Sequence, residues 1–330
     1  MDATRTSSTT TPAPSLAPFL RRRLGLDPGW PAEDFLRSQP GWLPPADVDT
    51  SHLHLPGTGR QPVPLRLYRP RGVADPLPGL LWFHGGGFTR GGLDWGEAHP
   101  LALTLASQAR IVVASVGYST ASYGHAWHDA RRAWSWFTAA REALGIVGVP
   151  AAGGASAGAS LALSATVVER PERTPPAAAF LGAYGLYHAR IPEPDAAVAA
   201  ALACLPPQVR FDTVAHTRWV ARIRADLRDP GALAPAERPL DDMPPAALVS
   251  CQIDDLRPST EAFAQTLRSR GVPVRELRVD GVIHGHLNWL PGPELPQVGQ
   301  TLDFLAAAVN ELTATHQQAR VALTKEQPCP

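Results

Sequence analysis

The sequence predicts an α/β fold built on a mainly parallel β-sheet with helices on both faces. Apolar, β-branched segments of strand length alternate along the chain with amphipathic segments of helix length. The apolar segments are hydrophobic along nearly their whole length, which is typical of strands buried on both faces. No repeat of fixed period interrupts this alternation. The 330 residues therefore predict one large layered domain.

The strands are expected at 78–83, 109–118, 149–154, 176–186, 245–253 and 274–283. Between and after them, apolar residues recur at three- and four-residue spacing, which predicts helices at 125–144, 160–170, 259–271 and 298–312. In parallel sheets of this kind, ligands bind beyond the carboxyl ends of the strands. The residues that directly follow the strands are therefore the candidates for a functional site.

Two segments break the alternation and are predicted to cap the sheet. Residues 16–50 and 187–240 are expected to form this helical cap, while 51–186 and 241–315 form the core. The alternative is that both segments merely cover an edge of the sheet. The Ser-, Thr- and Pro-rich residues 1–15 are predicted to be a disordered tail, and residues 316–330 a C-terminal tail.

Composition excludes several classes of protein. Lys plus Arg and Asp plus Glu both number 30, so the chain lacks the basic footprint of a nucleic-acid-binding protein. No apolar window is long enough to span a membrane, and the N-terminus lacks a secretory signal, so a cytoplasmic protein is expected. The three cysteines are too scattered for a disulfide framework. His125 and His128 lie near Asp129 but lack a third ligand, so no metal site is predicted.

The most informative motif is the serine in Gly154-Ala155-Ser156-Ala157-Gly158. It lies between a predicted strand and a predicted helix. A sharp turn there needs small neighbours and exposes the serine hydroxyl at the edge of the sheet. Ser156 is therefore predicted to be a nucleophile.

A second motif, His84-Gly85-Gly86-Gly87-Phe88, directly follows the strand at 78–83. Glycines allow a loop to present backbone N–H groups toward a ligand, and a tetrahedral oxyanion requires such preorganised donors. A plain glycine-rich turn is the alternative interpretation. The presence of Ser156 favours an oxyanion loop.

A serine nucleophile needs a base and a carboxylate, which in this arrangement follow it in the order acid, then histidine. Asp254 follows the strand at 245–253, and His284 follows the strand at 274–283. Neighbouring residues at a strand end point to opposite sides, so only one of Asp254 and Asp255 can reach the imidazole. His286 is a possible competitor of His284 if the chain there is extended.

From about residue 60 to 312, the chain resembles the hormone-sensitive-lipase-like carboxylesterases of the α/β-hydrolase fold. The segments that carry the resemblance are VPLRLYRP, HGGGF, GASAGASLA, PPAALVSCQIDDLRPSTEAF and VIHGHLNW. The resemblance implies that Ser156 is the nucleophile, Asp254 orients the base, and His284 is general base and then acid. It also implies an oxyanion hole formed by the Gly85–Gly87 loop and the N–H of Ala157.

The chain departs from the family pattern at several positions. Ala155 replaces the acidic residue that usually precedes the nucleophile, and residues 118–123 replace the usual Tyr-Arg-Leu-Ala-Pro-Glu. Asp255 replaces a proline and is expected to lie at the N-terminus of the following helix. The altered loop leaves the substrate class open. The substrate pocket is predicted to include Phe88, Trp95, Trp219 and His286.

The resemblance implies a cofactor-independent serine hydrolase that acts through an acyl-enzyme on short-chain or specialised-metabolite esters. Its expected partner is a small-molecule ester. Because relatives often dimerise, a second copy of the chain in a homodimer is also expected. One alternative is acyl transfer, elimination or cyclisation on the same scaffold. Another is a non-catalytic small-molecule receptor, against which the presence of Ser156, Asp254 and His284 argues.

Overall fold

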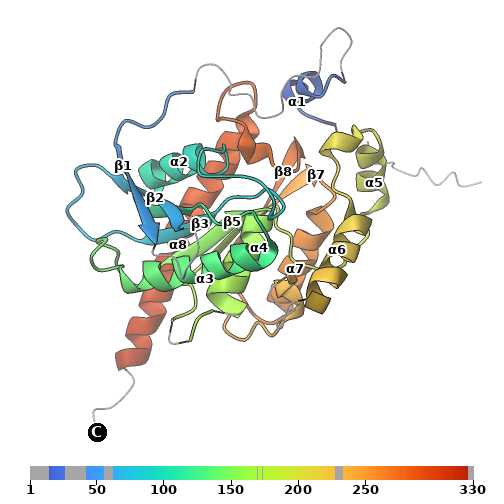
Figure 1. Cartoon of the computed structure of the whole chain (residues 1–330). Helices are drawn as coiled ribbons and strands as arrows, with labels where there is room; N and C mark the ends of the chain where they lie inside the picture. Colours follow the sequence, from blue (N-terminus) through green and yellow to red (C-terminus); the bar gives the residue numbers. More distant parts are fainter. Residues whose placement is uncertain are drawn as a thin grey trace, which may run out of the picture.

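The computed structural model describes residues 15–26, 42–55, 62–168, 170–172, 174–226 and 233–325, with side chains described up to residue 314. In these residues eight strands form one sheet in the order β1-β2-β4-β3-β5-β6-β7-β8 (Figure 1). Strand β1 pairs antiparallel with β2, and β2 pairs antiparallel with β4, while all other neighbours are parallel. The mainly parallel sheet confirms the predicted fold class. The strands are β1 (Val48–Leu55), β2 (Val63–Pro70), β3 (Gly79–Phe83), β4 (Val112–Val116), β5 (Ala151–Ala155), β6 (Phe180–Ala183), β7 (Ala246–Ile253) and β8 (Val274–Ile283).

Helices cover both faces of the sheet, with α3 and α4 in front of it and α8 behind it in Figure 1. Two apolar clusters result because neighbouring strand residues point to opposite faces. In β3, for example, Trp82 belongs to the cluster under α2 and α8, whereas Phe83 belongs to the cluster under α3, α4 and α7. None of the described helices has the length and apolarity that a membrane span requires. The helices are α1 (Pro18–Arg23), α2 (His99–Ala109), α3 (Tyr123–Ala139), α4 (Ala157–Leu163), α5 (Ala196–Ala203), α6 (Thr213–Asp226), α7 (Arg257–Ser269) and α8 (Pro296–Lys325).

All six predicted strands and four predicted helices are present, with shifted ends. The segment at 176–186 is strand only over Phe180–Ala183, because Tyr184 turns the chain with a φ of 39°. The last helix continues to Lys325, past residue 316, where the C-terminal tail was predicted to start. The predicted cap segment 16–50 also overlaps the sheet, since β1 begins at Val48. Periodicity missed β1 because this edge strand is mostly polar and exposed.

The segment between β6 and β7 contributes helices α5 and α6, which lie beside β7 in Figure 1. Of the predicted N-terminal cap segment, α1 is described and residues 27–41 lie outside the described residues. Phe19 of α1 packs edge-on against Trp289 with ring centroids 6.3 Å apart. The N–H of Ala17 donates to Gly281 O near the end of β8, at 2.8 Å. Both segments therefore lie near carboxyl ends of strands, and their function as a cap stays a prediction.

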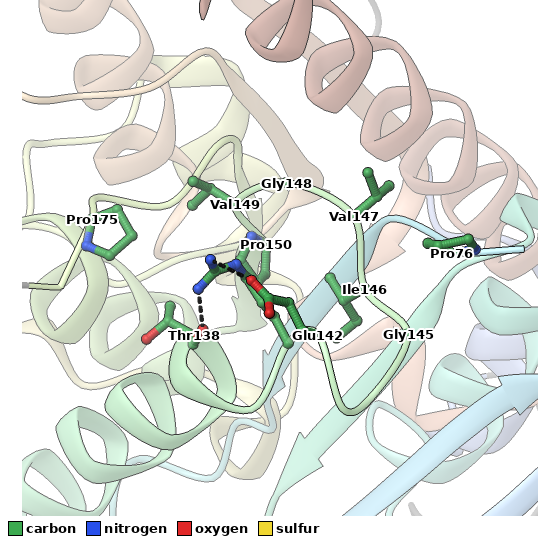
Figure 2. Close-up of a pocket in the computed structure, with 11 residues that line it drawn as sticks. Pro76, Thr138, Glu142, Gly145, Ile146, Val147, Gly148, Val149, Pro150 and Pro175 are labelled. Atoms are coloured by element: carbon green, nitrogen blue, oxygen red, sulfur yellow. Dashed lines mark hydrogen bonds and ion pairs between the residues drawn. The ribbon is translucent and has the colours of Figure 1, made fainter.

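A cavity of about 670 Å³ lies at the opposite, amino-terminal edge of the sheet (Figure 2). It is lined by residues that precede β3 and β5, including Pro76 and Val149. Its charged side chains are engaged locally, because Arg141 donates to Thr138 O and to Glu142. Because its lining residues precede the strands, this cavity is separate from the candidate site residues, which follow the strands.

The start of α4 packs unusually tightly against the end of β3. A Cβ atom on Gly158 would overlap the carbonyl oxygens of Phe83 and His84, and one on Gly154 would overlap the backbone of Gly158. Only hydrogen at these two positions lets strand β5 and helix α4 meet at so sharp a turn. The two glycines of the motif are thus a steric requirement of the fold.

We expect Gly158→Ala to lower the free energy of unfolding by about 1–3 kcal/mol, because the methyl group must displace backbone atoms. Gly299 in α8 is the matched control, since its Cβ position has nothing within 4 Å. Gly299→Ala should stabilise by up to about 1 kcal/mol through helix propensity. Chemical denaturation followed by circular dichroism measures both. Equal stability of the two variants would contradict the proposed close approach.

Candidate active site

Ser156 occupies the turn between β5 and α4 in a strained backbone conformation. Its φ of 53° and ψ of −121° are rarely adopted by residues other than glycine. The surrounding structure holds this conformation, because Ser156 N donates to Ala183 O of β6 at 2.8 Å, while Ala159 N donates to Ser156 O at 3.1 Å. The residue remains 9% exposed. The turn thus presents the hydroxyl at the carboxyl edge of the sheet.

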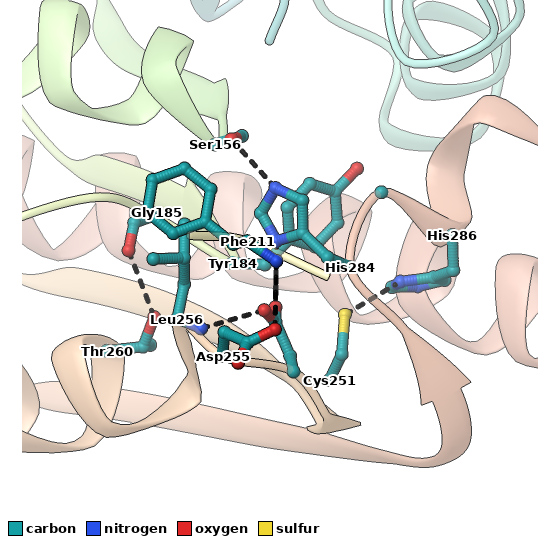
Figure 3. A network of polar contacts seen from close by, with 12 residues as sticks. Ser156, Tyr184, Gly185, Phe211, Cys251, Asp255, Leu256, Thr260, His284 and His286 are labelled. Atoms are coloured by element: carbon teal, nitrogen blue, oxygen red, sulfur yellow. Dashed lines mark hydrogen bonds and ion pairs between the residues drawn. The ribbon is translucent and has the colours of Figure 1, made fainter. Parts of the chain in front are cut away.

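The structure brings His284 and Asp254 to the Ser156 hydroxyl (Figure 3). His284 Nε2 lies 2.9 Å from Ser156 Oγ, and Nδ1 lies 2.8 Å from Asp254 Oδ2. The three side chains follow β5, β7 and β8, which lie almost side by side at the same edge of the sheet. These are the distances that a nucleophile, a base and an orienting carboxylate require.

The environment of His284 tunes it as a base. Burial lowers its pKa, but the negative charge and hydrogen bond of Asp254 oppose this and prevail, so the pKa is raised above 6.5. Asp254 is itself 1% exposed, and its other oxygen accepts a hydrogen bond from Leu256 N at 2.8 Å. A carboxylate bonded at both oxygens is fixed in position and can orient the imidazole.

The glycine loop after β3 lies against Ser156, but its first N–H is already used. Gly85 N donates to Glu97 Oε1 at 2.7 Å, which corrects the prediction that Gly85 contributes its N–H to the oxyanion hole. Within the described residues, no hydrogen bond partner engages the N–H groups of Gly86, Gly87 or Ala157. These three remain the candidate oxyanion donors.

Sequence reasoning missed Glu97, a carboxylate buried behind the glycine loop. It is 2% exposed and accepts hydrogen bonds from Gly85 N and from the Tyr184 hydroxyl, the latter at 2.9 Å. Burial raises the pKa of Glu97, while these two donors lower it. The Tyr184 ring in turn packs edge-on against His284, with centroids 5.1 Å apart. An acidic residue beyond a glycine loop has no distinctive spacing, so only the fold could reveal this contact.

His286 does not belong to a substrate pocket, which corrects the prediction. Its side chain is 0% exposed, with Nδ1 3.3 Å from Cys251 Sγ and Nε2 2.7 Å from Thr301 Oγ1. Burial lowers its pKa to about 3. His286 lies there because Gly285, with a φ of 76°, begins a single helical turn at His286, so the chain is not extended as assumed. His286 therefore cannot replace His284 as the base.

Asp255 lies directly before the N-cap of α7, as expected, and it has a partner that the sequence did not indicate. Its carboxylate forms a two-pronged ion pair with Arg210, with distances of 2.8–3.2 Å. Asp255 Oδ2 additionally accepts a hydrogen bond from Phe211 N at 2.9 Å. Neighbouring carboxylates thus take different partners, with Asp254 facing His284 and Asp255 facing the segment between α5 and α6.

The predicted aromatic pocket residues surround the glycine loop. The Trp219 ring of α6 stacks on Phe88, with centroids 5.7 Å apart and an interplanar angle of 10°. Trp95 lies near His84, with ring centroids 6.4 Å apart. Phe88 and Trp219 therefore join the glycine loop to α6. No described contact places any of these three side chains against Ser156 Oγ, and their role as pocket residues stays a prediction.

The arrangement can activate a hydroxyl for attack on an acyl carbon. The imidazole can take the proton of Ser156, and Asp254 can stabilise the imidazolium that forms. The N–H groups of Gly86, Gly87 and Ala157 offer stabilisation to the oxyanion that develops. All of these groups belong to the chain itself.

Comparison with known proteins agrees with this geometry. A family model described as alpha/beta hydrolase fold matches residues 80–288. The chain is 29% identical to the carboxylesterase NlhH of Mycobacterium tuberculosis, covering 77% of this chain and 80% of that protein. It is 31% identical to an ethyl acetate hydrolase of Pseudomonas putida, covering 71% and 74% respectively.

A solved esterase from Pyrobaculum calidifontis superposes with a TM-score of 0.67 at 27% identity, over 80% of this chain and 85% of that one. The matched residues include the glycine loop, Ser156, Asp254 and His284. The chain therefore belongs to the α/β-hydrolase family, within its hormone-sensitive-lipase-like group.

Proposed function

We propose that this protein is a carboxylesterase that hydrolyses small esters through an acyl-enzyme on Ser156. The observation that carries the proposal is the unbroken chain of contacts from Ser156 Oγ through His284 to Asp254. Similarity to proteins named carboxylesterase and ethyl acetate hydrolase supports the reaction class. The retained nucleophile and base favour an enzyme over a receptor.

Acylation begins when His284 Nε2 takes the proton of Ser156 and Ser156 Oγ attacks the ester carbonyl carbon. The carbonyl oxygen becomes an oxyanion, to which Gly86, Gly87 and Ala157 donate their N–H groups. Asp254 stabilises the imidazolium formed on His284. The imidazolium then protonates the leaving alcohol as the tetrahedral intermediate collapses to the acyl-enzyme.

Deacylation repeats the sequence with water. His284 takes a proton from the water molecule, whose oxygen attacks the acyl carbon. The second tetrahedral intermediate uses the same oxyanion donors. Collapse returns the proton to Ser156 and releases the carboxylic acid. No cofactor is needed in either half of the reaction.

Replacing the nucleophile tests the proposal most simply. Ser156→Ala should lower kcat for a p-nitrophenyl ester by about 10⁶-fold, because the remaining groups cannot form an acyl-enzyme. Ser160→Ala is the control, since Ser160 lies one turn along α4 and is also buried. It should keep near-wild-type turnover. If the Ser156 variant still turned over at a comparable rate, the proposed nucleophile would be incorrect.

The pH dependence of kcat/KM tests the base. Only neutral imidazole can accept the proton, so activity should rise with pH through an apparent pKa above 6.5, because Asp254 favours the charged form. In Asp254→Asn the strongest of the influences that raise this pKa is lost, and only the charges of Glu97 and Asp255 still oppose burial, so the midpoint should move to lower pH. The same variant should lose about 10⁴-fold in kcat. An unchanged midpoint would show that Asp254 does not act on the titrating base.

Glu97→Gln tests the support of the glycine loop. The single amide oxygen of glutamine can accept from only one of the two donors, Gly85 N–H or the Tyr184 hydroxyl, so the other donor loses its carboxylate acceptor. We expect a loss of about 1–3 kcal/mol in unfolding free energy, together with a lower kcat. Glu142→Gln is the control, because the Glu142 side chain is 84% exposed. If both variants behaved like the wild-type protein, Glu97 would not hold the loop.

A further inference from the structure

Asp255 attaches the segment between α5 and α6 directly to the turn that follows β7 and carries Asp254, which we call the acid turn. Arg210 Nε and Nη2 reach the two oxygens of the Asp255 carboxylate, and the N–H of Phe211 reaches one of them. The Asp255 side chain is 9% exposed. A charge buried to this degree needs a partner, so the ion pair is a fixed feature and not a fluctuating surface contact.

Arg210 ties a third element to the same point. Its Nη1 donates to Leu202 O in α5 at 2.7 Å. The planar guanidinium therefore holds the α5 helix, the connection to α6 and the acid turn in one geometry. A two-pronged contact of this kind specifies orientation as well as proximity.

A second attachment joins α6 to the glycine loop. Trp219 of α6 stacks on Phe88, which directly follows the candidate oxyanion donor Gly87. The region from α5 to α6 is thus attached to the acid turn by Arg210 and to the glycine loop by Trp219. In Figure 3 the ring of Phe211 points toward the side of the network where Ser156 and His284 meet.

We infer that the Asp255–Arg210 ion pair is a positioning device for substrate selection, which holds Phe211 and Trp219 over the site so that it accepts esters of short acyl chains. The inference rests on the proposed function, because it concerns which esters reach Ser156. Asp255 acts through the residues it positions and takes no part in proton transfer.

The chemistry of the attachment favours an apolar substrate. The carboxylate of Asp255 and the guanidinium of Arg210 neutralise each other, so neither charge is left for a substrate. What the segment offers beside the acid turn and the glycine loop is aromatic surface, from Phe211 and Trp219. A segment fixed at two points cannot withdraw to make room for a long chain.

The test compares kcat/KM for p-nitrophenyl acetate, butyrate and octanoate in Asp255→Ala and Arg210→Met. Releasing the segment should raise the octanoate-to-acetate ratio by about tenfold or more, which is within the range that changed apolar contacts produce. The double variant should show a shift smaller than the sum of the two single shifts, since both single variants remove the same ion pair. Arg210→Lys, which keeps the charge but loses the fork, should lie between wild type and Arg210→Met.

Phe211→Ala removes the aromatic ring but leaves the ion pair in place. It should also raise the octanoate-to-acetate ratio of kcat/KM. Arg224→Met is the matched control, because Arg224 of α6 forms an ion pair of 2.8 Å with Glu237, which lies between α6 and β7, without contacting the acid turn. Its ratio should stay at the wild-type value. Circular dichroism checks that each variant is folded.

Covalent labelling by a small fluorophosphonate distinguishes a failure of the proposed function from a failure of the inference about Asp255 and Arg210. Failure to label Ser156 in the wild-type protein would overturn the proposed function itself. If Ser156 is labelled in every variant but the folded Asp255, Arg210 and Phe211 variants keep the wild-type ratio, the inference is overturned. A shift of equal size in Arg224→Met would also overturn it, since any loosening of α6 would then suffice.

Discussion

The strained turn at Ser156 is the constraint on which the rest of the site depends. Strand β5 lies between β3 and β6, so a sharp turn at its end reaches the glycine loop on one side and Ala183 on the other. The turn is possible because Gly154 and Gly158 lack side chains where the backbones meet. The cost of the positive φ at Ser156 is offset by the packing of α4 against β3.

Three buried carboxylates around this turn have separate tasks because their partners differ. Asp254 faces the imidazole of His284, Asp255 faces Arg210, and Glu97 faces the backbone of the glycine loop. Each is held in place by hydrogen bonds to the chain, which compensates for its burial. Three independent contacts thus fix the imidazole of His284, the segment between α5 and α6, and the glycine loop.

Much of this could be predicted from the sequence, for identifiable reasons. Buried parallel strands are apolar throughout, and the residues that follow them, Ser156 and His284 among them, carry local motifs. The edge strand β1 escaped detection because its residues are mostly polar. The contacts of Glu97 and Asp255 could not be foreseen, since each depends on a partner distant in sequence and on burial that no local pattern reveals. His286 was misplaced because an extended chain was assumed there, whereas Gly285 adopts a φ of 76° and begins a single helical turn.

The proposed mechanism requires that the ester's acyl group passes through Ser156. The most direct measurement mixes the protein with a slowly deacylating p-nitrophenyl ester, quenches with acid during turnover, and determines the intact mass and the modified peptide by mass spectrometry. An acyl-enzyme on Ser156 predicts a mass increase equal to one acyl group, located on the peptide that contains Ser156. Acylation of a different residue, or a p-nitrophenol burst without any acylated protein, would contradict it.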